Sequence, residues 1–204
     1  MNVSIFDYGA GNLHSLAKAL DRPDVTLHVE TNPLRAIETD VLVLPGVGAY
    51  GTAVERLRDG RDAMRQAVSR GLPTIGICLG MQLLFEGSDE GPGDGLGVIA
   101  GRVTRLRAVR VPQIGWNSIE PAESDPLLDA APLSAVYYAN SYVCRPVDPA
   151  VVTAWTQHEG DRFPAVVRTG RAVGVQFHPE KSSVHGIRFL HAFLDDVRAR
   201  EDLP

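Results

Sequence analysis

Short apolar runs alternate with amphipathic stretches along the first half of the chain. Four runs predict strands at 3–6, 25–29, 41–44 and 74–77, and several of them lack polar alternation, as in strands covered on both faces. Helical stretches lie between these runs, at 13–20, 53–70 and 79–85, and the last is apolar enough to be buried. Regular alternation of strand and helix indicates a parallel α/β sheet.

The second half of the chain favours shorter strands joined by turns. These strands are expected at 98–110, 136–138, 151–155, 165–168 and 172–177. A final amphipathic helix is predicted at 184–200, and the glycine-rich stretch 87–95 is expected to be a surface loop. We therefore expect one α/β domain over 1–204, with a central, mostly parallel sheet, an antiparallel extension and helices on both faces.

Composition narrows the class of protein. The chain has 204 residues, 44% of them hydrophobic, which is enough to bury the core of one domain. A net charge of −5 gives no electrostatic reason to expect nucleic acid or an anionic membrane as partner. No secretory signal or spanning segment is expected, and Cys78 and Cys144 are too few for a disulfide framework. A cytoplasmic location fits these features best.

A cysteine lies where the predicted strand 74–77 meets the predicted helix 79–85, in the run Gly76-Ile77-Cys78-Leu79-Gly80. A strand-to-helix elbow exposes the side chain at its bend and requires small residues two positions before and after it. The helix start favours a thiolate, and the Leu79 N–H is available to an oxyanion. On its own, Cys78 also fits a small buried residue in a turn.

The run His178-Pro179-Glu180 supplies an imidazole and a carboxylate 100 residues after the cysteine. Residues i and i+2 of an extended segment point the same way, so Glu180 is expected to hold one ring nitrogen while the other faces Cys78. The three residues would provide a nucleophile, a base and a group that orients the base. A structural histidine is the alternative; a metal site with His185 lacks a convincing third ligand.

The segment Pro45-Gly46-Val47-Gly48-Ala49 follows the predicted strand 41–44. Its two glycines let backbone amides approach a ligand closely. If this strand lies beside 74–77, those amides sit near Cys78 and complete an oxyanion hole. An ordinary strand-to-helix turn is the alternative.

The motifs around the cysteine and the histidine resemble the class-I (triad) glutamine amidotransferases. Further segments are similar to the glutaminase subunits of imidazole glycerol phosphate synthase, and these are residues 7–13 (DYGAGNL), 44–49 (LPGVGA), 114–117 (IGWN) and 176–182 (QFHPEKS). The resemblance extends from Asp7 to the last helix.

The resemblance implies a cysteine-dependent hydrolysis of glutamine. Cys78 would attack the side-chain amide, His178 would move the proton, and Glu180 would orient His178. The amides of Leu79 and of the Val47–Gly48 loop would hold the oxyanion. The residues implied to contact L-glutamine are Gln82, Glu90, Ser141 and Tyr142. No cofactor and no metal are implied.

The resemblance also implies a partner, because free ammonia is useful only if it is delivered. In the resembling enzymes, a (β/α)₈-barrel cyclase subunit adds the ammonia to a ribulosyl phosphate intermediate, and products are imidazole glycerol phosphate and an aminoimidazole carboxamide ribotide. Asn12 and Lys181 match positions that face this partner. Val47-Gly48 is implied as a switch that the partner's ligand controls.

Two positions depart from the resembling family, which usually has histidine at both. This chain has Gln113 before Ile114-Gly115-Trp116-Asn117, and Asn140 before Ser141-Tyr142. Neither is a position of the triad, so the chemistry should survive, whereas basal activity or regulation could differ.

Other classes of protein have weaker signals. A dinucleotide-binding turn at 9–14, with Glu30 as the ribose-binding acid, lacks its third glycine, which His14 replaces. In α/β-hydrolases the acid precedes the histidine, whereas here Glu180 follows His178. A non-catalytic module conflicts with the intact Cys–His–Glu set. An amidotransferase that serves another acceptor is the main competitor.

Overall fold

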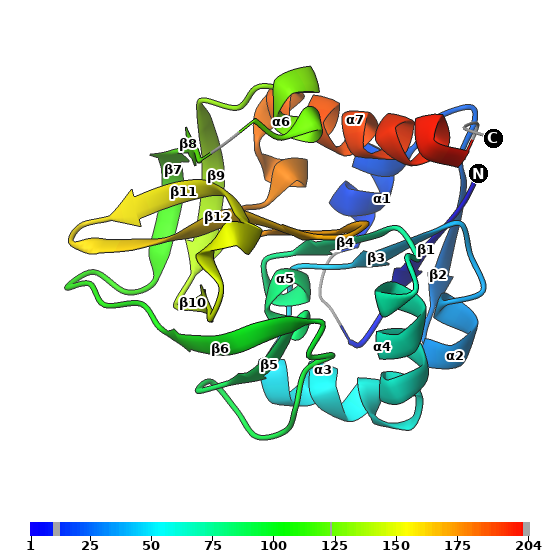
Figure 1. Ribbon diagram of the computed structural model, residues 1–204, viewed down its shortest axis with the longest axis horizontal. Helices are drawn as coiled ribbons and strands as arrows, with labels where there is room; N and C mark the ends of the chain where they lie inside the picture. The colour runs from blue at the N-terminus through cyan, green and yellow to red at the C-terminus, as the bar shows by residue number, and fades with distance from the viewer. Residues whose placement is uncertain (10–12, 123, 202–204) are drawn as a thin grey trace.

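An eight-stranded sheet forms the centre of the computed structural model, which describes residues 1–9, 13–122 and 124–201 (Figure 1). The strand order is β2-β1-β3-β4-β13-β12-β11-β8. The strands are β1 (Asn2–Phe6), β2 (Thr26–Glu30), β3 (Val41–Leu44), β4 (Thr74–Ile77), β8 (Glu120–Pro121), β11 (Val152–His158), β12 (Asp161–Thr169) and β13 (Ala172–Val175). The pairs from β2 to β13 are parallel, and the pairs from β13 to β8 are antiparallel. The predicted parallel sheet with an antiparallel extension is confirmed.

Two apolar cores sandwich this sheet, because successive residues of a strand point to opposite faces. In β3, Val41 and Val43 enter one core, whereas Leu42 and Leu44 enter the other. Helices α1 (His14–Leu20), α6 (Pro126–Ala130) and α7 (Ser183–Glu201) lie on the first side (Figure 1). Helices α3 (Tyr50–Leu57), α4 (Arg61–Ser69) and α5 (Leu79–Leu83) lie on the second. Strands β1, β3 and β4 are covered on both faces, as their apolar runs predicted, whereas the edge strand β2 has no buried residue.

Two smaller sheets complete the fold. One has the order β10-β6-β5, formed by Tyr142–Pro146, Ile99–Arg105 and Phe85–Ser88. The other pairs β7 (Gln113–Ser118) with β9 (Ala135–Asn140). None of the helices in the described part of the chain is long and apolar enough to cross a membrane.

The predicted continuous helix over 53–70 is wrong. The chain forms α3, then the 3₁₀ turn η1 (Arg58–Gly60), and then α4. Gly60 marks the break, because a Cβ there would lie 2.6 Å from Cγ of Pro33, at the start of the short helix α2 (Pro33–Ala36). The amphipathic pattern predicted helical conformation on both sides of Gly60. It did not predict the close contact with Pro33 that interrupts the helix.

Several boundaries also differ from the prediction. Helix α5 ends at Leu83, and β5 begins at Phe85, so part of the expected helix and of the expected loop 87–95 is a strand. Strand β6 ends at Arg105 rather than 110. Five short elements had no prediction from the apolar pattern: α2, α6, β7, β8 and β10. Their stability comes from tertiary contacts, which local periodicity does not report.

Candidate functional site

Cys78 lies at the predicted elbow between β4 and α5. Its backbone has φ 47° and ψ −100°, a conformation that residues other than glycine rarely adopt. The Cys78 N–H donates to the carbonyl of Val175 at 2.7 Å, which ties the elbow to the end of β13. The turn therefore holds the sulfur at the carboxyl end of the parallel strands, where α/β folds place their ligands.

The two glycines around this cysteine are required by close backbone packing. A Cβ at Gly76 would lie 2.5 Å from the carbonyl oxygen of Gly80, on the other arm of the elbow. A Cβ at Gly80 would overlap the carbonyl group of Leu44 at the end of β3. The predicted requirement for small residues on both sides of Cys78 is confirmed.

Replacing Gly80 by alanine is expected to destabilise the fold by about 3 kcal/mol, because a backbone carbonyl cannot move away as a flexible side chain does. At a solvent-exposed position inside a helix, the same change would instead stabilise the fold by up to about 1 kcal/mol, because alanine has the higher helix propensity. The sign of the change in the free energy of unfolding therefore distinguishes steric overlap from helix propensity. Urea unfolding of the purified chain measures the change. Gly160→Ala, where no atom lies within 4 Å of the added Cβ, should stay within about 0.5 kcal/mol of wild type. Equal stability of both variants would refute the packing account.

His178 reaches the sulfur from the neighbouring strand. Because β13 and β4 pair in register at Val175 and Ile77, the chain after β13 passes beside Cys78. The His178 N–H donates to the Tyr137 carbonyl at 2.8 Å, and the Ser182 hydroxyl donates to the His178 carbonyl at 2.7 Å. The histidine backbone is thus fixed from two sides, and its side chain is buried.

Glu180 holds the histidine ring. Its Oε1 lies 2.8 Å from His178 Nδ1, and both side chains are buried from solvent. The expected extended segment is wrong, since Pro179–Lys181 forms the 3₁₀ turn η3. Pro179 fits the first position of that turn, where no N–H is needed, and the turn still brings the carboxylate to the ring.

The protonation of His178 follows from this arrangement. Burial lowers its pKa, but hydrogen bonds to Cys78 and Glu180 and the charges on those groups outweigh burial and raise the pKa to about 9. The imidazole is therefore protonated at neutral pH. Cys78, His178 and Glu180 form one contiguous array, with the histidine in the middle.

A cavity of about 340 Å³ opens beside this array. Its lining includes most of the residues that the sequence singled out, namely Val47, Gly48, Cys78, Leu79, Gln82, Glu90, Ser141, Tyr142, His178 and Lys181. Glu180 lies behind His178 rather than in the lining. Asn12 lies outside the described residues. Segments from five distant parts of the chain therefore converge on a single hollow.

The 45–48 loop forms one wall of this cavity. Strand β3 pairs with β4, as the prediction for the loop required, so the loop emerges next to the elbow. The buried Tyr8 hydroxyl donates to the Pro45 carbonyl and anchors the loop. A Cβ at Gly46 would lie 2.9 Å from Cε1 of His178, so only glycine lets the loop lie against the ring. Gly48 has φ 141°, which also favours glycine.

The opposite wall is the chain between β9 and β10. Gln82 and Asn140 both donate to the Tyr142 carbonyl, at 3.3 Å and 3.2 Å, and so fix the Ser141–Tyr142 segment. Asn140 faces Gln113 across the β7–β9 pair, so the two departures from the usual histidines are cross-strand neighbours. Both amides are buried, and each has a side-chain oxygen without a hydrogen-bond partner in the described structure.

Partial burial raises the pKa of Glu90, and the N–H of Tyr50 opposes that shift. Glu90 therefore lies beside the first residue of α3, the helix that follows the 45–48 loop. Its carboxylate reaches the cavity from the loop after β5.

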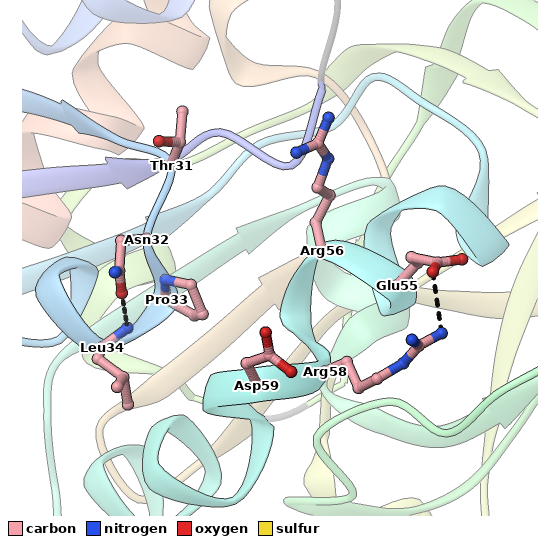
Figure 2. A pocket seen from close by; sticks show the side chains of 8 residues that line it. All are labelled: Thr31, Asn32, Pro33, Leu34, Glu55, Arg56, Arg58 and Asp59. Atoms are coloured by element: carbon pink, nitrogen blue, oxygen red, sulfur yellow. Dashed lines mark hydrogen bonds and ion pairs between the residues drawn. The ribbon is translucent and has the colours of Figure 1, made fainter.

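A larger hollow of about 650 Å³ lies elsewhere, between α2 and the α3–η1 segment (Figure 2). Asn32 caps α2 by accepting from the N–H groups of Leu34 and Arg35, and Arg58 pairs with Glu55 at 2.9 Å. None of the predicted site residues lines this hollow. Size alone is therefore a poor guide to the reactive centre of this chain.

Sequence reasoning gave no role to three residues that shape the site. Tyr8 anchors the loop, Ser182 fixes the histidine backbone, and Gln176 donates from Nε2 to Cys78 Sγ at 3.5 Å. All three lie in motifs that carried the resemblance. Only the pairing register of β13 with β4 would have placed Gln176 beside the cysteine.

Comparisons with known proteins agree with this geometry. A family model described as glutamine amidotransferase class-I matches residues 4–197. The imidazole glycerol phosphate synthase subunit HisH of Synechococcus sp. (strain JA-3-3Ab) is 41% identical over 98% of this chain and 96% of that protein. The HisH subunit of Symbiobacterium thermophilum is 45% identical over 92% of this chain and 91% of that protein.

A solved structure described as a glutamine amidotransferase superposes with a TM-score of 0.73 at 22% identity. The match covers 96% of this chain and 98% of that one, and shows a shared fold. With the full-length HisH relatives, these findings assign the chain to the class-I glutamine amidotransferase family and, within it, to the HisH subunits of imidazole glycerol phosphate synthase.

Proposed function

We propose that this chain is the glutaminase subunit of an imidazole glycerol phosphate synthase and that residues 1–204 form its one amidotransferase domain. It hydrolyses L-glutamine and delivers the ammonia to a (β/α)₈-barrel cyclase subunit in histidine biosynthesis. The observation that carries the proposal is the buried Cys78–His178–Glu180 array at a cavity of about 340 Å³. The HisH names of the full-length relatives support the choice of acceptor.

The array supports a two-step hydrolysis. Cys78 Sγ attacks the side-chain amide carbon of glutamine, and protonated His178 gives its proton to the departing nitrogen, so that ammonia leaves and a γ-glutamyl thioester remains. A water molecule then attacks the thioester carbonyl while His178 takes its proton. Collapse of that intermediate releases glutamate and restores the cysteine. Glu180 keeps the ring oriented through both steps.

Backbone amides are the source of oxyanion stabilisation. The Leu79 N–H, at the first turn of α5, has no acceptor within its helix and lies next to the nucleophile. The Val47–Gly48 peptide forms the facing wall of the cavity. A flip of that peptide, which the glycine permits, would add a second donor.

The cavity walls supply groups that match the two ends of a glutamine molecule. The carboxylate of Glu90 can bind the α-ammonium group of glutamine. Gln82, Ser141 and Tyr142 can bind its α-carboxylate and the carbonyl oxygen of its side-chain amide. A neutral amide side chain thereby reaches Cys78 while both charged groups of the substrate are bound.

Lys181 follows the triad directly and is exposed at the rim of the cavity. We propose that Lys181 and Asn12 contact the cyclase subunit. A cytoplasmic location is proposed with this function, and the free thiols of Cys78 and Cys144 are compatible with it.

Ammonia transfer tests the proposal. The cyclase subunit, its ribulosyl phosphate substrate and glutamine are mixed with or without this chain, and imidazole glycerol phosphate is measured. Product is expected from glutamine only when the chain is present, whereas an ammonium salt should replace both glutamine and the chain. If ammonium supports the cyclase but glutamine with the chain does not, the acceptor assignment fails.

Replacing Glu180 by glutamine should shift the alkaline limb of the pH profile of kcat/KM to lower pH, by about one unit. The sign follows from His178, because Glu180 helps raise its pKa to about 9, and the proton needed by the departing ammonia is lost above that pKa. Glutamate release from pH 6 to 10 measures the limb, with Glu120→Gln on β8 as an exposed control. An unmoved limb in Glu180→Gln would contradict this role of Glu180.

A further inference from the structure

Two groups lie near the sulfur of Cys78 besides His178: the Ala139 carbonyl, 4.0 Å from Sγ, and the side-chain amide of Gln176. Gln176 Nε2 donates to Sγ at 3.5 Å, within the longer range of hydrogen bonds to sulfur. The contact follows from the strand register, since residue 176 comes directly after Val175, which pairs with Ile77. The Gln176 N–H donates to the Ala165 carbonyl at 2.9 Å and fixes the backbone at this point.

Apart from the contact with Sγ, the position of the Gln176 side chain offers it little stabilisation. It is fully buried, and its Oε1 has no hydrogen-bond partner in the described part of the chain. A buried amide with an unpaired oxygen destabilises a fold by about 1–3 kcal/mol. A methionine of similar shape would avoid this penalty, so stability gives no reason for an amide at this position.

We propose that Gln176 is a positioning residue for the nucleophile, and that its amide donor holds Cys78 Sγ in place and stabilises the thiolate. This inference rests on the proposed glutaminase function and deepens it. His178 lies on one side of the sulfur as the group that moves protons, and Gln176 lies beside it as a donor that does not titrate. The thiolate would then keep one donor after His178 has passed its proton to ammonia.

The titratable groups around Cys78 allow a direct test of this role. Burial, followed by the charge on Cys78, raises the pKa of Tyr8 and of Cys144 well above their ordinary values, so both stay neutral in the assay range. Among the described residues, His178, held by Glu180, also faces the sulfur, and Glu90, Tyr142 and Lys181 line the same cavity. None of these groups is changed when Gln176 is substituted.

The experiment compares alkylation of Cys78 by iodoacetamide as a function of pH in wild type and in Gln176→Met, with the modified peptide identified by mass spectrometry. The pH midpoint is expected to rise by about one unit in the variant, equivalent to roughly 1.4 kcal/mol of lost thiolate stabilisation. The thermal midpoint of unfolding should be unchanged or higher, because the unpaired oxygen is removed. Thr74→Val removes a buried hydroxyl from the other end of β4 and should leave the pH midpoint unchanged.

Three outcomes separate the claims. A raised pH midpoint in Gln176→Met with intact stability supports the positioning role. An unchanged midpoint, or a lowered unfolding temperature as its only effect, overturns that role while leaving the glutaminase function in place. Failure of the wild-type chain, in complex with the cyclase subunit, to hydrolyse glutamine would instead overturn the proposed function itself.

Discussion

Replacing Cys78 by alanine should lower glutamine hydrolysis by the complex with the cyclase subunit at least about 10⁴-fold. In the proposed mechanism this thiol forms the thioester, and the described residues place only this sulfur both in the cavity and against His178. Cys144, the other thiol, is fully buried and does not line the cavity. Steady-state release of glutamate measures the loss.

Cys144→Ala provides the matched control, since it removes the same group from β10 and should change the rate by less than about threefold. Cys78→Ala should also keep its affinity for the cyclase subunit, because the sulfur lies inside the cavity whereas Lys181 lies at its exposed rim. Residual hydrolysis in Cys78→Ala above about a hundredth of the wild-type rate would contradict a covalent role for this cysteine.

The cyclase subunit with its bound ligand should stimulate glutamine hydrolysis by about 10²–10³-fold over the isolated chain. This is the effect of adding one donor to an oxyanion hole, and the Val47–Gly48 peptide is the group positioned to add it. Gly48 has φ 141°, and its neighbours on the loop are exposed, so little packing opposes a flip of this peptide. Glutamate release is measured for the chain alone, with the cyclase subunit, and with both subunits and the ribulosyl phosphate.

Gly48→Ala tests the loop. An added Cβ would lie 3.3 Å from Cδ2 of Leu79, and the positive φ is unfavourable for alanine. The substitution should therefore restrict the conformations that the Val47–Gly48 peptide can adopt. We expect the basal rate to change little and the stimulation to fall at least about tenfold. Full activity of the isolated wild-type chain, or full stimulation of Gly48→Ala, would contradict the switch.

Patterns local in the sequence predicted the part of the fold that surrounds the site. The runs at 41–44 and 74–77 have little alternation because both faces are buried, and they coincide with β3 and β4. Gly76 marked the elbow because its constraint comes from Gly80, which is close in sequence, whereas the overlap that excludes a Cβ at Gly80 comes from Leu44 at the end of β3. The helix break at Gly60 was missed, since it depends on packing against Pro33, a residue far away in the chain.

The chemistry of the site could be predicted to a similar extent. Residue types and motifs pointed to Cys78, His178 and Glu180, and the structure brings them together. Gln176 lies in the 176–182 motif, but no role could be predicted for it from the sequence. Its contact with the sulfur depends on the register between β13 and β4. Pairwise register is a tertiary property, so periodicity along a single strand cannot report it.

Covalent trapping at Cys78 tests the central claim most directly. The complex of the chain with the cyclase subunit is treated with 6-diazo-5-oxo-L-norleucine, a glutamine analogue with an electrophilic carbon, and label and activity are followed together. One label per chain on the peptide that carries Cys78 is expected, with glutamine hydrolysis falling in proportion and with protection by added glutamine. Label on a different residue, or full hydrolysis by chains labelled at Cys78, would contradict the assignment of Cys78 as the nucleophile.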